Sequence, residues 1–327
     1  MPVVRSLIAG CGGYLPERCV PNAALAEEFG IDTSDNWIVE RTGIRQRHIA
    51  APGETASAMG SAAARQALER AGIDASAVDA IIVATATPDS AFPATAVRIQ
   101  QQLGITQGFA FDISAACTGF VYALSMADAL LRTGQARCAL VIGTEVFSRI
   151  LDWTDRGTCV LFGDGAGAVV LTAGEGDGTA TDRGILATHL HADGRQGDIL
   201  LVDGGAGSTG GTGLLRMAGK EVFRHAVSKL AAVVDEALEA NGLGHGDIRW
   251  LVPHQANLRI IEAMGKKLGL PRERVVITVD QHANTSAASI PLALAHAAEH
   301  GMIEAGDLVA LEAIGGGLTW GAALVRF

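Results

Sequence analysis

Asp112-Ile113-Ser114-Ala115-Ala116-Cys117-Thr118-Gly119-Phe120 lies where the sequence changes from a strand pattern to a helix pattern. Residues 108–113 alternate small and apolar side chains, whereas residues 121–131 carry Ala, Leu and Met at helical spacing. Cys117 is therefore expected near a helix N-terminus, where free N–H groups and the helix dipole lower a thiol pKa from about 8.5 to roughly 4–7. This predicts a thiolate nucleophile; the alternative is a buried cysteine that packs as a small hydrophobe.

Length and composition define the class of protein. The chain has 327 residues, of which 49% are hydrophobic, and a mean hydropathy of +0.28, which indicates a globular protein with a large core. The first ten residues lack the apolar core of a signal peptide, and no window reaches about 18 uncharged apolar residues. We therefore expect a cytoplasmic protein that does not associate with a membrane.

Cysteine spacing and net charge exclude two further classes of function. The five cysteines are scattered and form no C-x-x-C pair, which argues against a disulfide framework and against a zinc site, so no metal is expected. A formal net charge of −10 argues against nucleic acid as a partner, while leaving room for a local basic patch.

The sequence repeats itself at an interval of roughly 170 residues. The matching segments are 67–73 with 237–243, 81–83 with 250–252, 111–112 with 279–280, and 140–143 with 311–315. This duplication predicts two similar α/β halves, residues 1–175 and 176–327, related by a pseudo-two-fold axis. Because equivalent element ends meet at such an axis, we expect Cys117 and Asn284 to face the seam between the halves.

Two second-half side chains complete a candidate catalytic set. His254 follows a buried strand, at the end where open parallel sheets place their ligand sites, and Asn284 lies at the start of a helix. A cysteine, a histidine and an asparagine together supply a nucleophile, a hydrogen-bond donor or base, and a second donor that cannot ionise. Such donors stabilise an enolate or a tetrahedral oxyanion, which suits thioester chemistry. A papain-like hydrolase is a competing interpretation, but the sequence context of its cysteine is not found here.

A basic segment, residues 32–48, stands out in this acidic protein. It places Trp37 close to Arg41, Arg45 and Arg47. A guanidinium pairs with phosphate and an indole stacks on a purine, so the segment is a candidate site for a nucleotide-bearing cofactor. A solvated basic loop with a partly buried tryptophan is the alternative.

Several motifs in order resemble the β-ketoacyl-[acyl carrier protein] synthase III family of the thiolase-like superfamily. They extend over nearly the whole chain and are Gly13-Tyr14-Leu15-Pro16, Trp37-Ile38-Val39, Arg41-Thr42-Gly43-Ile44 and Gly315-Gly316-Gly317-Leu318-Thr319-Trp320-Gly321. The resemblance implies an α/β thiolase-like fold: two duplicated halves with mixed five-stranded sheets in a layered αβαβα arrangement.

The resemblance also implies a role for each candidate residue. Cys117 would take an acyl group from acyl-CoA, and the N–H groups of Cys117 and Gly316 would form the oxyanion hole. His254 and Asn284 would hold the malonyl thioester carbonyl during decarboxylation. Acyl-CoA would be a substrate, with no cofactor required. The implied coenzyme A contacts are Trp37, Arg41, Arg156 and Asn257; the implied residues that dock the acyl carrier protein are Arg224, Arg259, Lys266 and Lys267.

The implied assembly is a homodimer in which Phe92 closes the acyl pocket of the partner. The implied reaction is decarboxylative condensation of a short acyl-CoA, with acetyl-CoA as the expected primer, and malonyl-acyl carrier protein, which initiates fatty acid biosynthesis. Two alternatives stay open: a starter enzyme of secondary metabolism that uses a different primer, and a non-catalytic carrier-protein or CoA-binding module. The chain departs from the family pattern at Ala283 and Leu318, which stand where glycine and phenylalanine are common, and at Lys220, where some members have asparagine.

Overall fold

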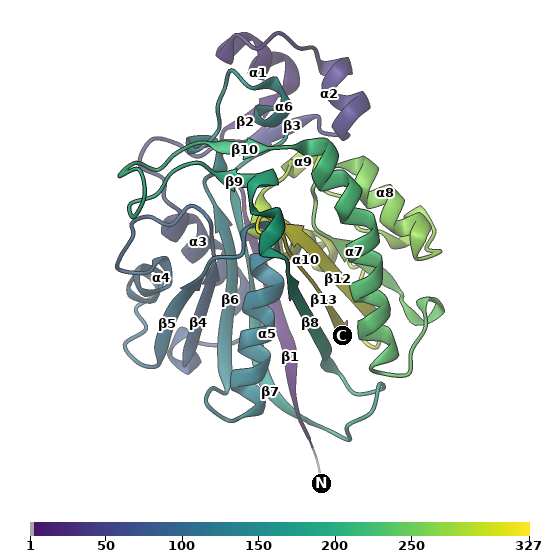
Figure 1. Cartoon of the computed structure of the whole chain (residues 1–327). Helices are drawn as coiled ribbons and strands as arrows, with labels where there is room; N and C mark the ends of the chain where they lie inside the picture. Colours follow the sequence, from purple (N-terminus) through teal and green to yellow (C-terminus); the bar gives the residue numbers. More distant parts are fainter. Residues whose placement is uncertain (1–2) are drawn as a thin grey trace.

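The computed structural model describes residues 3–327, and its first sheet is mixed. Buried strands β4 and β6 run parallel to each other, and β5 continues the parallel part, whereas β7 and β1 are antiparallel. The sheet order is β1-β7-β6-β4-β5 (Figure 1). The strands are β1 (Val3–Tyr14), β4 (Ala80–Ala84), β5 (Phe109–Ile113), β6 (Cys138–Glu145) and β7 (Gly165–Gly176).

The second sheet repeats this topology with one strand fewer. Its order, β8-β13-β12-β11, matches β1-β7-β6-β4 of the first sheet strand for strand, with the same parallel and antiparallel pairings. The expected duplication is therefore visible in the topology, and the α/β thiolase-like class is confirmed. The strands are β8 (Gly184–Ala192), β11 (Trp250–Pro253), β12 (Leu308–Gly315) and β13 (Thr319–Arg326).

The expectation of five strands in each sheet is wrong for the second sheet. The place of β5 is taken by a single parallel bridge between Leu251 and Val275. Beyond it, the Gln255 carboxamide accepts the N–H groups of Thr278 and Val279 at 2.8 and 3.0 Å. This side chain satisfies backbone groups that a longer strand would use, and the chain turns into the short helix α9 (Val279–His282). The repeat matched residues 279–280 to the strand end at 111–112. This match is wrong, because residues 279–280 begin a helix.

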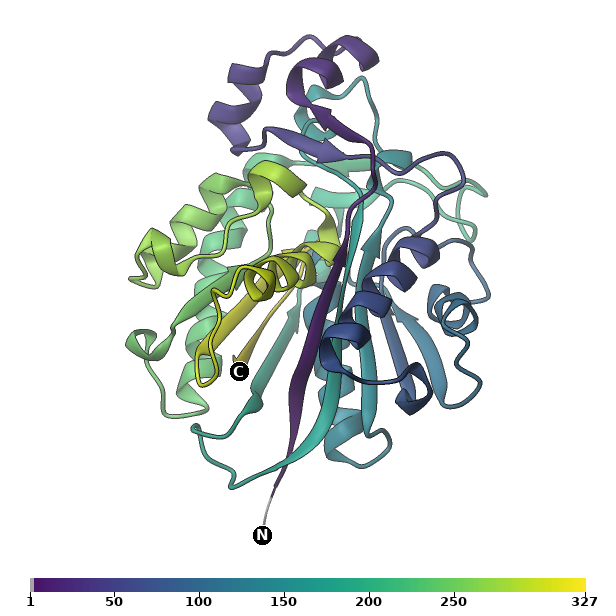
Figure 2. The ribbon, with the colours of Figure 1, turned by 180° about the vertical axis from the view of Figure 1, so that it is seen from behind.

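Helices separate and cover the two sheets in five layers. Helices α3 and α4 pack on the outer face of the first sheet, α5 and α10 lie between the sheets, and α7 with α8 covers the second sheet. Seen from behind, α3 and α10 flank the long strand β1 (Figure 2). The bounds are α3 (Ala56–Ala71), α4 (Thr95–Gln102), α5 (Gly119–Arg132), α7 (Gly219–Glu239), α8 (Leu258–Lys267) and α10 (Ser289–Glu299).

A cap of small elements lies above the sheets at one end of the molecule (Figure 1). The basic segment, residues 32–48, contains helix α2, because Ser34 accepts the N–H of Trp37 at the helix start and Gly43 ends it in a left-handed conformation. The cap consists of β2 (Cys19–Pro21), α1 (Asn22–Phe29), α2 (Asp35–Thr42), β3 (Gln46–His48) and α6 (Arg156–Cys159); the hairpin of β9 (Leu200–Val202) and β10 (Leu215–Met217) lies next to it.

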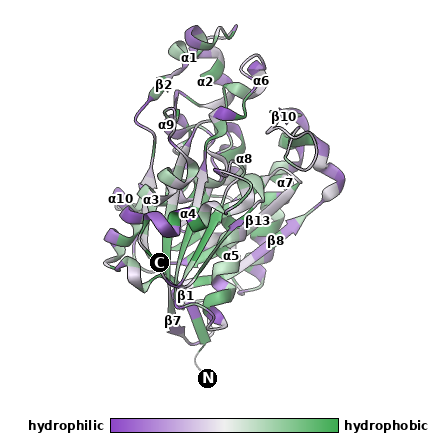
Figure 3. Ribbon diagram, turned by 90° about the vertical axis from the view of Figure 1, so that its left-hand side faces the viewer, coloured by the Kyte–Doolittle hydropathy of each residue, from purple (hydrophilic) through white to green (hydrophobic). Residues whose placement is uncertain are grey.

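Glycines allow backbone to touch backbone where the halves meet. A Cβ at Gly143 on β6 would lie 2.2 Å from the carbonyl oxygen of Ala287, and one at Gly167 on β7 would lie 2.5 Å from the nitrogen of Leu292. Both partners belong to the second half. The inner strands are predominantly hydrophobic (Figure 3), and β4, β6 and β12 are buried throughout. The seam is therefore tightly packed as well as apolar.

Within residues 3–327, no helix combines the length and apolar character needed to cross a membrane. The same residues contain no group of three or more His, Cys, Asp or Glu side chains placed to hold a metal ion.

Candidate active site

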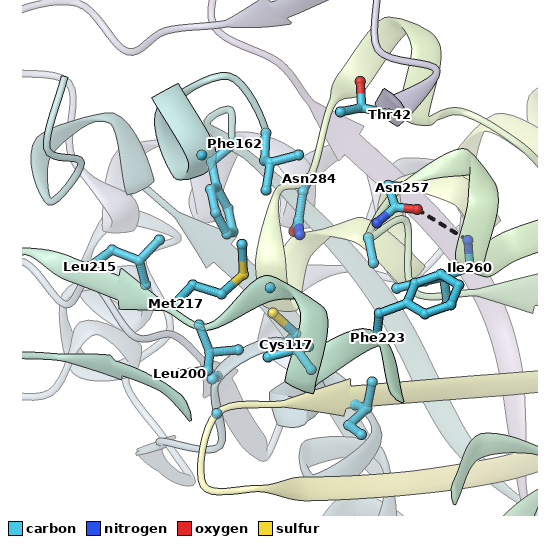
Figure 4. A pocket seen from close by; sticks show the side chains of 18 of the residues that line it. Thr42, Cys117, Phe162, Leu200, Leu215, Met217, Phe223, Asn257, Ile260 and Asn284 are labelled. Carbon is cyan, nitrogen blue, oxygen red and sulfur yellow. Dashed lines mark hydrogen bonds between the residues drawn. The ribbon is translucent and has the colours of Figure 1, made fainter. Parts of the chain in front are cut away.

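Cys117, His254 and Asn284 line one cavity of about 670 Å³ at the seam. Cys117 comes from the first half, in the turn that leads into α5. His254 follows β11, and Asn284 lies in the loop that leads into α10. Figure 4 shows Cys117 and Asn284 on the cavity wall. The structure thus brings together the three side chains that the sequence singled out.

The cysteine occupies a single 3₁₀ turn, Ala116–Thr118, that immediately precedes α5. Cys117 is only 6% exposed. Burial raises the pKa of its thiol to about 12, the Ser286 hydroxyl lowers the pKa, and the negative charge of Glu145 raises it. The expectation of a resting thiolate is therefore wrong for the unliganded protein, because loss of hydration outweighs the helix terminus. The thiol has to lose its proton as it reacts.

His254 is a buried, neutral imidazole with one polar partner on its ring. Burial lowers its pKa to about 3. Its Nδ1 lies 2.6 Å from the hydroxyl of Ser289, which itself accepts the backbone N–H of Gln255 at 3.3 Å. When the Ser289 hydroxyl donates to Nδ1, the ring proton is on Nε2. In that tautomer His254 can donate a hydrogen bond into the cavity.

Asn284 is oriented by contacts at both its backbone and its side chain. Its backbone N–H donates to Leu161, and its carbonyl accepts from Gly163, both in the first half. Its Oδ1 accepts the N–H of Ser286 at 2.9 Å. With the oxygen engaged, the amide nitrogen is the group free to donate. His254 and Asn284 therefore supply two N–H donors to the same cavity.

The closing glycine loop approaches the nucleophile from the second half. A Cβ on Gly315 would lie 2.8 Å from the backbone nitrogen of Cys117, so a side chain there would collide with the backbone at the nucleophile. The next residue, Gly316, lines the cavity. The glycines thus place a second stretch of backbone beside Cys117, the arrangement that an oxyanion hole requires.

The cavity around the sulfur is apolar. Phe147 and Phe162 stack with ring centroids 4.9 Å apart and form one wall. Leu200, Leu215 and Met217 from the β9–β10 hairpin face them (Figure 4). This lining excludes water and suits an acyl chain.

The mouth of the cavity carries an aromatic ring with two cations in contact with it. The guanidinium groups of Arg41 and Arg156 lie 4.8 and 4.7 Å from the centroid of the Trp37 ring. Trp37 and Arg41 line the cavity, whereas Arg156 lies beside the ring, outside the wall. Asn257 also lines the cavity, and its Oδ1 caps α8 through the N–H of Ile260 at 3.1 Å (Figure 4).

Four basic residues on α7 and α8 are exposed. They are Arg224, Arg259, Lys266 and Lys267. Arg259 reaches the cavity wall, and its guanidinium lies 5.7 Å from the centroid of the Phe223 ring. Phe92 lies outside the wall and is 85% exposed.

The departures from the family pattern have different surroundings. Ala283 precedes Asn284 with φ 57° and ψ −164°, a conformation that strongly favours glycine. Leu318 is fully buried in the core, away from the cavity wall, whereas Lys220 lines the cavity.

Sequence reasoning missed three polar residues around the site: Glu145, Ser286 and Ser289. Glu145 ends the buried strand β6, and a titratable residue at the end of a buried strand is the signal that identified His254. Ser289 opens α10, but only the fold reveals that it reaches His254. Nothing in the pattern around Ser286 distinguishes it from the neighbouring small residues.

Comparisons with known proteins identify the family of the chain. Residues 111–194 match the family described as 3-oxoacyl-[acyl-carrier-protein] synthase III, and residues 238–327 match its C-terminal family. β-Ketoacyl-[acyl-carrier-protein] synthase III of Acidiphilium cryptum is 66% identical over 99% of both chains, and that of Rhodospirillum centenum is 64% identical over 100% of both.

Solved structures similar to this chain support the same family. The synthase III from Aquifex aeolicus has a TM-score of 0.91 at 46% identity and covers 98% of this chain and 100% of its own. The priming β-ketosynthase of the R1128 polyketide pathway has a TM-score of 0.92 at 37% identity, covering 100% and 98% respectively. The chain belongs to the β-ketoacyl-[acyl carrier protein] synthase III family of acyl-transferring condensing enzymes.

Proposed function

We propose that this condensing enzyme joins a short acyl-CoA, with acetyl-CoA as primer, to malonyl-acyl carrier protein and so initiates fatty acid biosynthesis. The products are 3-oxoacyl-acyl carrier protein, CoA and CO2. One observation carries the proposal: a buried thiol and two oriented N–H donors, from opposite halves of the chain, line the same apolar cavity. The relatives at 66% and 64% identity share the synthase III name, whereas the polyketide-priming enzyme is 37% identical.

In the first half-reaction, Cys117 attacks the thioester carbonyl of acyl-CoA. The tetrahedral oxyanion takes hydrogen bonds from the backbone N–H groups of Cys117 and Gly316, and collapse of this intermediate expels CoA. The apolar wall around the sulfur receives the acyl chain. The close approach of Gly315 to Cys117 supports this arrangement.

In the second half-reaction, His254 and Asn284 donate to the thioester carbonyl of the malonyl group. As CO2 leaves, the negative charge moves onto that oxygen, and the two donors stabilise it as an enolate. The enolate carbon then attacks the acyl-cysteine and releases the Cys117 thiolate. A neutral His254 suits this role because it donates without a proton transfer.

Substrate delivery uses the charges at the cavity mouth. Trp37 would stack on the adenine of CoA, with Arg41 and Arg156 near its phosphates and Asn257 on the path toward Cys117. The exposed Arg224, Arg259, Lys266 and Lys267 would dock the acidic acyl carrier protein, which gives a positive surface a purpose on a chain of net charge −10.

The working form is proposed to be a cytoplasmic homodimer of two-half subunits, with the halves at 1–175 and 176–327, that uses no metal and no prosthetic group. Two features favour a partner copy: Phe92 projects into solvent, and β5 is an unpaired sheet edge that carries the stacked rings of Phe109 and Phe111. Phe92 would then close the acyl pocket of the partner subunit.

Mass spectrometry of the intact protein tests the function. The protein and a Cys117→Ala variant are mixed with straight, branched and aromatic acyl-CoAs. Selective acetylation that disappears in the variant is expected. Preferential loading of longer or aromatic groups would instead indicate a starter enzyme of secondary metabolism, and the absence of any adduct would leave a binding module.

A further inference from the structure

Glu145 is a buried carboxyl group at the seam that the proposed mechanism does not use. It ends β6 and is fully buried. The N–H of Ala86 donates to both carboxyl oxygens at 3.2 and 3.1 Å, and the hydroxyls of Thr85 and Thr87 donate to Oε2 at 3.3 and 2.6 Å. No basic side chain is among these partners, so the charge is supported by neutral donors alone.

Ser286 lies between this carboxyl group and the nucleophile. Its hydroxyl is buried and forms no hydrogen bond in the structure, so its proton can turn toward either neighbour, and it lowers the pKa of both Cys117 and Glu145. The 3₁₀ turns that contain Cys117 and Ser286 pack against each other, and the Ser286 turn also packs on β6. Ser286 adopts φ 51°, a conformation that non-glycine residues rarely occupy and that is often retained at functional sites.

We propose that Ser286 relays the Cys117 proton to Glu145, which stores it between the two half-reactions. This inference rests on the proposed role of Cys117 as the acyl acceptor. The like charge of Glu145 opposes a thiolate while the carboxyl group is ionised. Moving the thiol proton onto Glu145 removes that opposition at the moment when the sulfur becomes anionic.

The proton balances over the cycle. During loading, the Cys117 thiol gives its proton to the Ser286 oxygen, and the Ser286 proton passes to Glu145. The thiolate forms the bond to the acyl carbon, the bond from that carbon to the CoA sulfur breaks, and CoA thiolate takes a proton from solvent. During condensation, the enolate carbon displaces Cys117 as a thiolate, which recovers the stored proton from Glu145 through Ser286.

The pKa of Glu145 lies close to neutral pH, where a carboxyl group can both accept and release a proton. Burial raises its pKa to about 7, and the donors from Thr87, Ala86, Ser286 and Ala287 lower it. The titratable group facing it is Cys117, across Ser286; the other groups named here carry no charge. Only the carboxylate accepts a proton, so the loading rate is expected to rise with pH through about 7.

Ser286→Ala provides the direct test, because Ala116 and Ala283 already occupy positive φ in this chain. Single-turnover acylation of Cys117 is followed by quenched mass spectrometry, and malonyl-acyl carrier protein decarboxylation is measured separately. Ser286→Ala should slow acylation about 10²-fold, the usual contribution of positioned proton transfer, while decarboxylation stays near wild type. Thr285→Val, which removes a neighbouring buried and unpartnered hydroxyl, is the matched control and should change neither rate.

The Glu145→Gln variant tests the pH dependence. Its Cys117 should be acylated slowly, and the acylation rate should show no inflection near pH 7. Wild-type loading by Ser286→Ala would overturn the relay, as would an equal loss of loading and decarboxylation, which would indicate disturbed packing. If instead Cys117→Ala still became acylated, the proposed function itself would fail, so the two failures are distinguishable.

Discussion

Replacing Asn284 by aspartate tests whether the oriented amide stabilises the enolate. The Oδ1 atom of Asn284 already accepts the N–H of Ser286 at 2.9 Å, so the atom that faces the substrate is the amide nitrogen. Asn284→Asp keeps the shape and the contact with Ser286, but it replaces the free donor by a carboxylate oxygen. The perturbation is therefore confined to the side of the group that meets the reacting carbonyl.

Two effects of Asn284→Asp are both expected to slow decarboxylation. Loss of one oriented donor to a developing oxyanion costs about 10²–10³ in rate, or about 2.7–4 kcal/mol. A carboxylate next to the enolate adds repulsion that water screens weakly, because Asn284 is only 6% exposed. We therefore expect malonyl decarboxylation to fall by at least about 10²-fold.

The assay follows conversion of malonyl-acyl carrier protein to acetyl-acyl carrier protein by mass spectrometry in the absence of acyl-CoA. Acetylation of Cys117 by acetyl-CoA serves as the internal control and should stay within about a factor of ten of wild type, since Asn284 does not donate to that oxyanion. Decarboxylation at the wild-type rate would refute the assignment. Equal losses in both reactions would show that the substitution disturbs the fold of the site.

Three further substitutions examine the surrounding structure. Ser289→Ala removes the hydroxyl that lies 2.6 Å from His254 Nδ1, so the ring loses the partner that would keep its proton on Nε2, and decarboxylation should slow about 10²-fold; an unchanged rate would contradict this role of Ser289. Ala283→Gly should raise the free energy of unfolding in urea by about 1 kcal/mol by relieving a strained backbone, and an unchanged denaturation midpoint would show that no strain is present. Glu312 has a buried carboxyl oxygen without a partner, and burial raises its pKa to about 8, so the folded state loses stability by up to about 1.4 kcal/mol per pH unit as pH rises from about 4.5 to 8. Glu312→Gln should therefore gain more in unfolding free energy at pH 8 than at pH 5; an equal gain at both would contradict the raised pKa.

Periodicity and duplication in the sequence were sufficient for the regular parts of the fold. The repeated segments 81–83 and 250–252 lie in the equivalent strands β4 (Ala80–Ala84) and β11 (Trp250–Pro253). The pairing of the two halves follows from the repeat, because equivalent strands must occupy equivalent places in two similar sheets. The positions of Cys117, His254 and Asn284 at strand and helix ends then implied a shared site.

The remaining features depend on contacts between residues far apart in the chain. The fifth strand of the second sheet is missing because the Gln255 side chain binds backbone N–H groups 23 and 24 residues away. The Cys117 pKa was predicted with the wrong sign because its burial comes from both halves, whereas the helix terminus is local. Glu145 and Ser286 meet only across the seam, so no local pattern indicates their proximity.

At Gly143 and Gly167 the two halves pack so closely that a Cβ on either glycine would collide with the backbone of the other half. A hinge requires a gap or a compliant side chain, and at these points backbone atoms already meet. Domain closure, a common means by which enzymes assemble a site after binding, would have to break this packing. We therefore expect the donors to be aligned before substrate arrives, and the β9–β10 hairpin and the cap to adjust to acyl chains of different length.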